Sequence, residues 1–474
     1  MVLKFAIFFV TLHFQKNVTM QEVLNYIEQN RDRFIEELCS LIRIPSISAE
    51  SEHKPDMVRC AERWCELLTK AGVDRAEMLT TTGNPLVYAE KIIDPAKKTV
   101  LVYGHYDVMP VTPLELWNTE PFEPVIKEGK IFARGADDDK GQSFMQAKAF
   151  ETMVATSTLP CNVKFLFEGE EEIGSPALKV WLQEPENKAK LKADVILVSD
   201  TDMVSAEVPS ITTGLRGLVK FEMRLTGPDH DLHSGDFGGT VSNPVNVLSQ
   251  MIGTVLDKDG HITIPGFYDD VLVCSDEERE LINRAPYSDE AYKKSVGVEV
   301  LHGEKGYTTL ERIGIRPTFD VCGIQGGYSG EGFKTIIPSE AWAKLSFRLV
   351  AKQDPERIAA LVENYFRSIC PDSVKIAFTY YEKGMPYVCP IDLPEYKAAE
   401  QAMQDTYGMQ PIPAHSGCSI SIVSDFEREL GLKSILLGFG LGADNIHAPN
   451  ENYRLDRFFK GIETAVAYFQ HYGK

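Results

Sequence analysis

A histidine and an aspartate two residues apart, His105 and Asp107, are the strongest local indication of chemistry in the sequence. In an extended chain, side chains at this spacing point to the same side. A carboxylate there can accept one N–H of the imidazole, which leaves the other ring nitrogen to bind a metal ion. Taken alone, the pair is more simply a hydrogen-bonded histidine in a turn, so its meaning depends on the other groups.

Two acidic segments supply further candidate ligands. Asp137, Asp138 and Asp139 are adjacent, and their mutual repulsion costs stability unless a cation or solvent screens it. Glu171 and Glu172 are also adjacent, which suits a division of labour between metal binding and proton transfer. In isolation, the first segment is typical of a solvated turn and the second of a charged helix start.

Two more groups complete the set: Asp200, and the segment from Asp444 to Glu451 that contains His447. Four of the five groups follow the carboxyl end of a predicted strand, and the run of aspartates 137–139 opens a predicted helix. Because ligands bind at the carboxyl ends of the strands in open α/β sheets, the five groups are predicted to converge. Two histidines, two aspartates and one glutamate suit Zn²⁺, with Mn²⁺ or Co²⁺ as alternatives. One shared carboxylate can bridge two ions about 3.5–4 Å apart, the spacing used for hydrolysis.

The elements that would position these groups alternate in type. Short apolar runs predict buried strands at residues 99–103, 163–167, 195–198 and 434–437, with helical stretches such as residues 142–152 between them. This alternation predicts an α/β domain with a mostly parallel sheet and helices on both faces.

The pattern changes near residue 209. Residues 218–225 and 341–349 alternate apolar and polar positions, as one-sided antiparallel strands do, and two helical segments are interleaved with them. We therefore predict a catalytic α/β domain in two parts, residues 20–208 and 386–474, interrupted by an inserted α+β domain, residues 209–385. Residues 266–315 are predicted to be a polar, weakly structured excursion.

Charge and cysteine content bear on partners and location. The formal net charge of −20 repels phosphate backbones and anionic lipids, so we expect neither nucleic acid nor a membrane as a partner. Nine scattered cysteines without paired spacing predict free thiols and a cytoplasmic protein. The apolar residues 5–14 are too few to span a bilayer but leave export as an alternative, and Met20 is an alternative start to Met1.

The order His-x-Asp, Asp-Asp-Lys-Gly, Glu-Glu-x-Gly-Ser, Ser-Asp and a late histidine resembles a known family. It is similar to the dinuclear-zinc exopeptidases of the carboxypeptidase, aminoacylase and dipeptidase group, and most similar to the carnosinase and cytosolic nonspecific dipeptidase branch. Matching segments run from residue 20 to the C-terminus. The resemblance implies hydrolysis of a small peptide, a dipeptide, by water activated between two Zn²⁺ ions per subunit. It also implies a homodimer in which the insert serves as lid and dimerisation domain.

The resemblance assigns the metal ligands by position. His105 and Asp200 would hold one zinc ion, Glu172 and His447 would hold the other, and Asp138 would bridge the two.

The same resemblance implies three roles around the ligands. Glu171 would be the general base that takes a proton from the bridging water, and Asp107 the carboxylate that orients His105. His233, in the insert, would reach the active site of the partner subunit and stabilise the oxyanion. From the sequence alone, a loop histidine with local hydrogen bonds is the simpler interpretation of His233.

Arg348, Thr335 and Ser419 match the family's substrate-binding positions. Arg348 lies on the polar face of its predicted strand, so it is free to bind a carboxylate bidentately. The substrate end departs from the family pattern, because Ser416 stands where the animal dipeptidases carry an acid. Asp202 also replaces a usual tyrosine, which makes it a candidate partner for a free amine.

Two alternatives remain open. The same scaffold could be a deacylase or carboxypeptidase for N-acylated amino acids, although the long insert and its Asp-Leu-His-Ser-Gly segment favour a dipeptidase. A non-catalytic metal-binding or peptide-binding relative is the alternative of another class. Such a relative would be expected to lose a ligand or the base, and this sequence keeps all of them.

Overall fold

The apolar runs of the sequence form the centre of a nine-stranded sheet in the computed structural model, which describes residues 20–473. The apolar segment 5–14 and the start site Met1 lie outside these residues, and the alternative start site Met20 is the first of them. In sheet order the strands are β1 (Arg75–Leu79), β2 (Leu86–Lys91), β6 (Asn162–Glu168), β3 (Thr99–His105), β7 (Val195–Val198), β18 (Ser434–Leu436), β9 (Ser210–Leu215) and β16 (Tyr387–Val388), and β17 (Ile412–His415) pairs with β9. The central strands β6, β3, β7 and β18 are parallel, and antiparallel pairings join the strands on either side of them. The mostly parallel sheet is confirmed.

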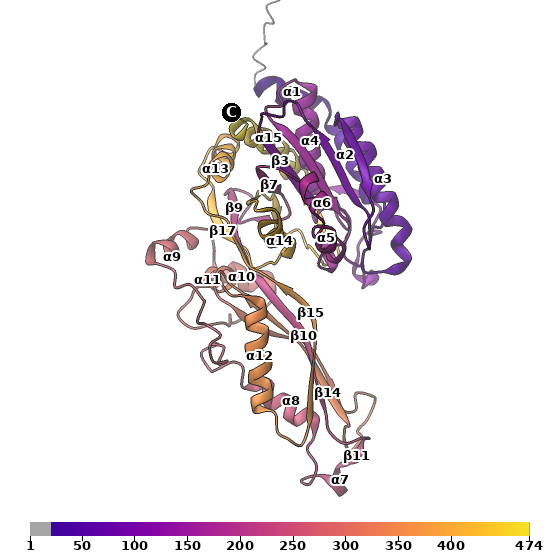
Figure 1. Ribbon diagram of the computed structural model, residues 1–474, viewed down its shortest axis with the longest axis vertical. Helices are drawn as coiled ribbons and strands as arrows, with labels where there is room; N and C mark the ends of the chain where they lie inside the picture. Colours follow the sequence, from indigo (N-terminus) through magenta and orange to yellow (C-terminus); the bar gives the residue numbers. More distant parts are fainter. Residues whose placement is uncertain (1–19, 474) are drawn as a thin grey trace, which may run out of the picture.

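Helices cover both faces of this sheet (Figure 1). On one face, Trp64 of α3 (Lys54–Ala71) packs on Phe167 with ring centroids 4.4 Å apart, and α4 (Lys140–Ala155) packs beside it. On the other face, Phe426 of α14 (Ser421–Leu430) meets Tyr103 at 5.1 Å. The outer helices are α1 (Met20–Gln29), α2 (Arg31–Ile42), α5 (Pro176–Trp181), α6 (Pro185–Lys190), α13 (Pro394–Tyr407) and α15 (Leu455–Tyr472). A small sheet of β20 (Asn452–Arg454), β5 (Lys130–Phe132) and β4 (Val125–Lys127) flanks them.

The insert has its own antiparallel sheet and its own core. Its strands, in order, are β12 (Thr318–Gly326), β14 (Glu340–Leu349), β10 (Gly217–Thr226) and β15 (Lys375–Gly384). Alternate apolar residues such as Phe221 and Phe347 face α8 (Pro244–Gly253) and α12 (Pro355–Ile369), as the alternating pattern predicted. The chain passes from the large sheet to this one at Arg216, and returns just before β16.

Two features differ from the predicted organisation. Ser210–Leu215, which the prediction placed in the insert, forms β9 of the large sheet because it is a fully buried run. The segment predicted as weakly structured contains three short helices, α9 (Asp276–Ile282), α10 (Asp289–Val296) and α11 (Thr309–Gly314). Helices α9 and α11 begin with capping boxes, Ser275 with Glu278 and Thr308 with Glu311, so the sequence did contain their start signals.

The tip of the insert lies at the opposite end of the molecule from β3 and β7 (Figure 1). It is built from β11 (Leu232–His233), β13 (Ile336–Ile337) and α7 (Ser234–Phe237). Among residues 20–473, no helix has the length and apolar character needed to cross a membrane.

Candidate metal centre

The five candidate ligands, which come from five separate segments, meet in one place. The Nε2 atom of His105 lies 3.0 Å from Asp138 Oδ1 and 3.8 Å from Asp200 Oδ2. The Nε2 atom of His447 lies 2.8 Å from Asp138 Oδ2 and 3.1 Å from Glu172 Oε2. The ligand atoms of each triad all lie within 4.8 Å of one another. Asp138 belongs to both triads and offers one carboxylate oxygen to each.

The chemistry of this cluster fits two divalent cations. The Nε2 atom of His105 is buried and has no hydrogen-bond partner in the described part of the chain. Asp138 and Glu172 raise the pKa of His447 to about 11, which shows how strongly the cluster attracts positive charge. Burial raises the pKa of Asp200, because a carboxylate removed from water needs a counter-charge to stay ionised. Imidazole nitrogens and carboxylate oxygens are ligands for Zn²⁺, Mn²⁺ or Co²⁺.

A close approach between β3 and α4 places His105 beside Asp138. The carboxylate of Asp139 accepts hydrogen bonds from the main-chain N–H of His105 at 3.1 Å and the hydroxyl of Ser143 at 2.6 Å. A Cβ atom on Gly104 would lie 1.8 Å from the Ser143 hydroxyl oxygen, so only glycine fits at this position. The end of the strand and the start of the helix are thereby held together.

Glu451 holds the loop that presents the shared carboxylate. Its side chain is fully buried and accepts the main-chain N–H groups of Gly135, Asp137 and Asp138 at 3.0, 3.0 and 3.1 Å. Arg134 donates to the same carboxylate at 2.6 Å. In the sequence, Glu451 only ends the segment that contains His447, and no local pattern indicates its role in holding the loop.

Asp107 lies against His105 with both its main-chain carbonyl and its carboxylate. The Nδ1 atom of His105 is hydrogen-bonded to the main-chain carbonyl of Asp107 at 3.1 Å, while the carboxylate lies 3.3 Å away. The carboxylate accepts the main-chain N–H groups of Glu171 and Glu172 at 3.2 and 3.1 Å. Asp107 therefore also fixes the 3₁₀ turn Glu171–Ile173, on which both glutamates stand.

The backbone at His447 is in the left-handed region, with φ of 61°. L-residues other than glycine adopt this conformation at an energetic cost, and such residues are concentrated at functional sites. The imidazole is half exposed and completes the open side of the cluster.

The structure also joins two of the predicted substrate-binding residues, Arg348 and Ser419. Arg348 Nη1 donates to the Ser419 hydroxyl at 2.7 Å across the gap between insert and large sheet. Arg216, which the sequence analysis missed, donates through Nε to the Gly417 carbonyl at 2.9 Å. Its buried Nη1 has no partner among residues 20–473, and burial, with repulsion from Arg348, lowers the pKa of Arg216 to about 10.

Asp202 lies on β8 (Asp202–Met203), which pairs with β19 (Gly440–Leu441), and burial of its carboxylate near Asp444 raises its pKa to about 7. A Cβ atom on Gly440 would lie 2.6 Å from Asp202 Oδ1 and 2.7 Å from Asp137 Oδ2, so both carboxylates face this glycine. They are acidic groups that neither candidate triad uses.

His233 and Thr335 do not join the cluster within one chain. Both belong to the tip of the insert, where the Ser234 N–H donates to the Thr335 carbonyl at 3.0 Å. His233 is 59% exposed and its Nδ1 accepts the N–H of Gly235 at 3.0 Å.

The chain is similar in sequence and in structure to known metallopeptidases. The model of peptidase family M20/M25/M40 matches residues 101–471. The Cys-Gly metallodipeptidase dug1 of Schizosaccharomyces pombe is 32% identical over 466 residues, which cover 95% of this chain and 98% of the relative. The structure of human carnosine dipeptidase 1 has a TM-score of 0.84 at 28% identity, covering 96% of this chain and 98% of its own. The structure of the M20 family metallo-carboxypeptidase Sso-CP2 from Sulfolobus solfataricus has a TM-score of 0.85 at 34% identity, covering 93% and 99%.

Proposed function

We propose that this chain, which belongs to peptidase family M20/M25/M40, is a dipeptidase that binds two zinc ions per subunit. The observation that carries the proposal is Asp138, whose two oxygens each serve one of two ligand triads. The similarity to a Cys-Gly metallodipeptidase and to carnosine dipeptidase supports a dipeptide as substrate. Mn²⁺ or Co²⁺ would suit the same donors.

Two cations held by these residues would acidify a water molecule and polarise the scissile carbonyl. We assign proton transfer to Glu171, because it belongs to neither ligand triad and is adjacent in the chain to the ligand Glu172. Asp107 holds the main-chain N–H groups of both glutamates, so the base and the ligand keep a fixed relation. The base would take a proton from the attacking water and return it to the leaving amine.

We assign the two charged ends of the dipeptide to two side chains of opposite charge. Arg348, steadied by Ser419, would bind the terminal carboxylate of the dipeptide. The carboxylate of Asp202, whose pKa is raised to about 7 by burial and by Asp444, would receive the free amine at the other end. Ser416 and Asp202 differ from the family pattern, so these ends are where we expect the specificity of this chain to differ.

We infer a homodimer in which each insert completes the site of its partner. His233 lies on β11, and Thr335 is hydrogen-bonded to the residue that follows it; Figure 1 shows β11 at the far end of the molecule from β3 and β7. The insert exposes apolar side chains there, with Phe333 91% and Phe237 42% exposed. Its edge strand β12 also exposes Ile324, so the surface offers both apolar area and free strand edge to a partner.

Complementation between inactive variants tests this arrangement. The variant His233→Ala should be nearly inactive, because one lost oxyanion donor typically costs about 10²–10³ in turnover. The variant Glu171→Ala should also be nearly inactive, because it lacks the general base. Mixed under conditions of subunit exchange, they should recover up to roughly a quarter of wild-type activity, since half the dimers are mixed and each has one whole site. No recovery despite demonstrated exchange would mean that His233 acts within its own chain or not at all.

We also propose a cytoplasmic location. All nine cysteines lie within the described residues, and all nine are free thiols. Such a set persists in a reducing compartment. Determining the mature N-terminus and the cell fraction that holds the protein would test this, and cleavage after the apolar segment 5–14 would contradict it.

A second candidate function is a carboxypeptidase or deacylase for N-acylated amino acids. It is supported by the similarity to Sso-CP2. It is also supported by the guanidinium groups of Arg216 and Arg348, which repel each other and together could bind a carboxylate. Hydrolysis of a dipeptide and of its N-acetylated form separates the two. A dipeptidase should prefer the free amine by about tenfold or more, the value of one charged hydrogen bond. A preference for the acetylated form would favour the second candidate, and hydrolysis of neither by the metal-loaded protein would favour a binding-only relative.

A further inference from the structure

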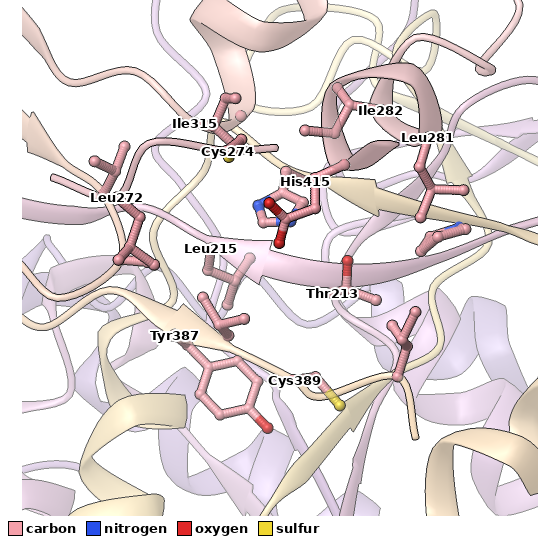
Figure 2. A pocket seen from close by; sticks show the side chains of 17 residues that line it. Thr213, Leu215, Leu272, Cys274, Leu281, Ile282, Ile315, Tyr387, Cys389 and His415 are labelled. Carbon is pink, nitrogen blue, oxygen red and sulfur yellow. The ribbon is translucent and has the colours of Figure 1, made fainter. Parts of the chain in front are cut away.

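A cavity of about 250 Å³ lies between the large sheet and the insert, and no step of the proposed reaction uses it (Figure 2). One side is formed by β9, β16 and β17 of the large sheet. The other side is formed by α9, the end of α11 and the residues that follow β14 in the insert. The cavity therefore lies at the junction where the chain passes between the two parts.

Most of the cavity wall is apolar, and two of its hydroxyl groups already have partners. The hydroxyl of Thr213 donates to the Ala414 carbonyl at 3.2 Å, and that of Tyr387 to the Ser434 carbonyl at 2.8 Å. Apolar side chains from both parts surround them: Leu215, Leu272, Leu281, Ile282 and Ile315. An apolar molecule would thus be buried here without stranding either hydroxyl.

Apart from the weakly donating thiol of Cys274, the polar side chains left for a ligand are acceptors. Burial lowers the pKa of His415 below its usual value, so its imidazole is neutral near pH 7 and keeps one acceptor nitrogen. His415 shares the cavity wall with Gly314 and with Glu278, whose carboxylate lies near enough to act on the imidazole. That carboxylate accepts one main-chain N–H, from Ser275 at 2.7 Å, and can accept more.

We propose that this cavity binds a small, neutral, mainly apolar molecule that carries one N–H or O–H donor, such as an indole or a substituted phenol. The volume is sufficient, because an apolar cavity of about 150 Å³ already accommodates benzene. The donor would meet His415 or Glu278, and the ring would lie among the apolar side chains of both parts.

Short chain segments connect the cavity wall to both partners of the contact between Arg348 and Ser419. His415, in its wall, begins the segment that leads to Ser419, and the next N–H in that segment donates to the Gly214 carbonyl at 2.8 Å. Val350, also in the wall, follows Arg348 by two residues. Occupancy is therefore expected to shift this contact and to change KM more than kcat. This coupling rests on the proposed function, whereas binding in the cavity does not.

Titration with indole, followed by saturation-transfer NMR and calorimetry, tests the site. Indole should bind the wild-type protein saturably, and toluene, which has no donor, should bind about five- to tenfold more weakly, the value of one hydrogen bond. Ile282→Trp should fill the cavity and weaken indole binding by about tenfold or more, and Leu281→Phe is a milder variant of the same kind. Val273→Trp is the matched control, because Val273 is 94% exposed and outside the cavity wall.

Thermal unfolding of each variant would confirm that it is folded before binding is compared. Absence of saturable indole binding to the wild-type protein, or equal binding to folded Ile282→Trp or Leu281→Phe, would overturn the site. Toluene binding as tight as indole binding would overturn the proposed ligand class. Indole that binds the wild-type protein but leaves KM for a dipeptide unchanged would overturn the coupling and leave the site itself supported.

Discussion

Replacing Glu451 by glutamine should weaken metal binding although Glu451 is no candidate ligand. The carboxylate accepts four donors, the guanidinium of Arg134 and three main-chain N–H groups, in a fully buried position. Glutamine keeps the shape but replaces one acceptor oxygen by a donor, so at least one N–H and the charge of Arg134 lose their partner. An unpaired buried group costs about 1–3 kcal/mol, and a broken buried ion pair about 3–5 kcal/mol.

Metal binding should weaken because the Glu451 carboxylate holds the backbone of the ligand Asp138. Two of the three N–H groups belong to Asp137 and Asp138, so their loss releases the backbone that aims Asp138 at both triads. Loss of a partner that orients a ligand typically costs about 10–100-fold in metal affinity. We therefore expect Glu451→Gln to bind zinc about tenfold or more weakly and to unfold at a lower temperature.

Competition of the protein with a fluorescent zinc chelator would measure this affinity. Asp456→Asn is the matched control, because Asp456 is half exposed and its carboxylate pairs with the nearby Arg454 and Arg457. A zinc affinity of Glu451→Gln within about twofold of the wild-type value would refute the reasoning. It would show that the loop holds Asp138 in place without these hydrogen bonds.

Three further predictions concern the base, the bridge and stability. Glu171→Gln should keep its metal content but lose about 10² or more in turnover, and retention of more than about a tenth of the activity would contradict the assignment. Asp138→Ala should lose at least one metal ion by elemental analysis while Asp137→Ala keeps more, and equal losses would indicate a diffuse acidic patch. Glu151→Gln removes one carboxylate partner of the buried Lys148, 2.6 Å away, while Glu37 stays at 2.6 Å. It should lower the free energy of unfolding in urea by about 1–3 kcal/mol, and a loss under about 0.5 kcal/mol would count against it. Although burial opposes ionisation of Glu151, its basic neighbours hold its pKa below the usual value, so its stabilisation is present above the unfolded pKa and is lost as the pH falls through the folded pKa.

The fold could be predicted where sequence pattern and burial coincide. The apolar runs at residues 99–103, 163–167 and 195–198 became β3, β6 and β7, the adjacent parallel strands of the sheet. The prediction failed at Ser210–Leu215, because a short run at a domain boundary shows no local sign of the sheet to which it belongs.

Some residues of the candidate site could likewise be predicted from the sequence, and others could not. Residues at strand ends, such as His105 and Asp200, could be expected to converge because parallel strands share one ligand-binding edge. Glu451 and Arg216 could not be found, since each acts on residues far away in the chain through hydrogen bonds to main-chain atoms. Such contacts depend on the tertiary fold and leave no periodicity or spacing in the sequence.

Stepwise return of zinc to the metal-free protein is the most direct test of a two-metal dipeptidase. Chelator-treated protein would receive measured amounts of zinc, and dipeptide hydrolysis and bound zinc would be recorded at each step. Because Asp138 joins two ligand triads, we expect binding to saturate at two zinc ions per chain, with full activity only when both are bound. Full activity with a single zinc ion per chain, or undiminished activity in the metal-free protein, would contradict this account.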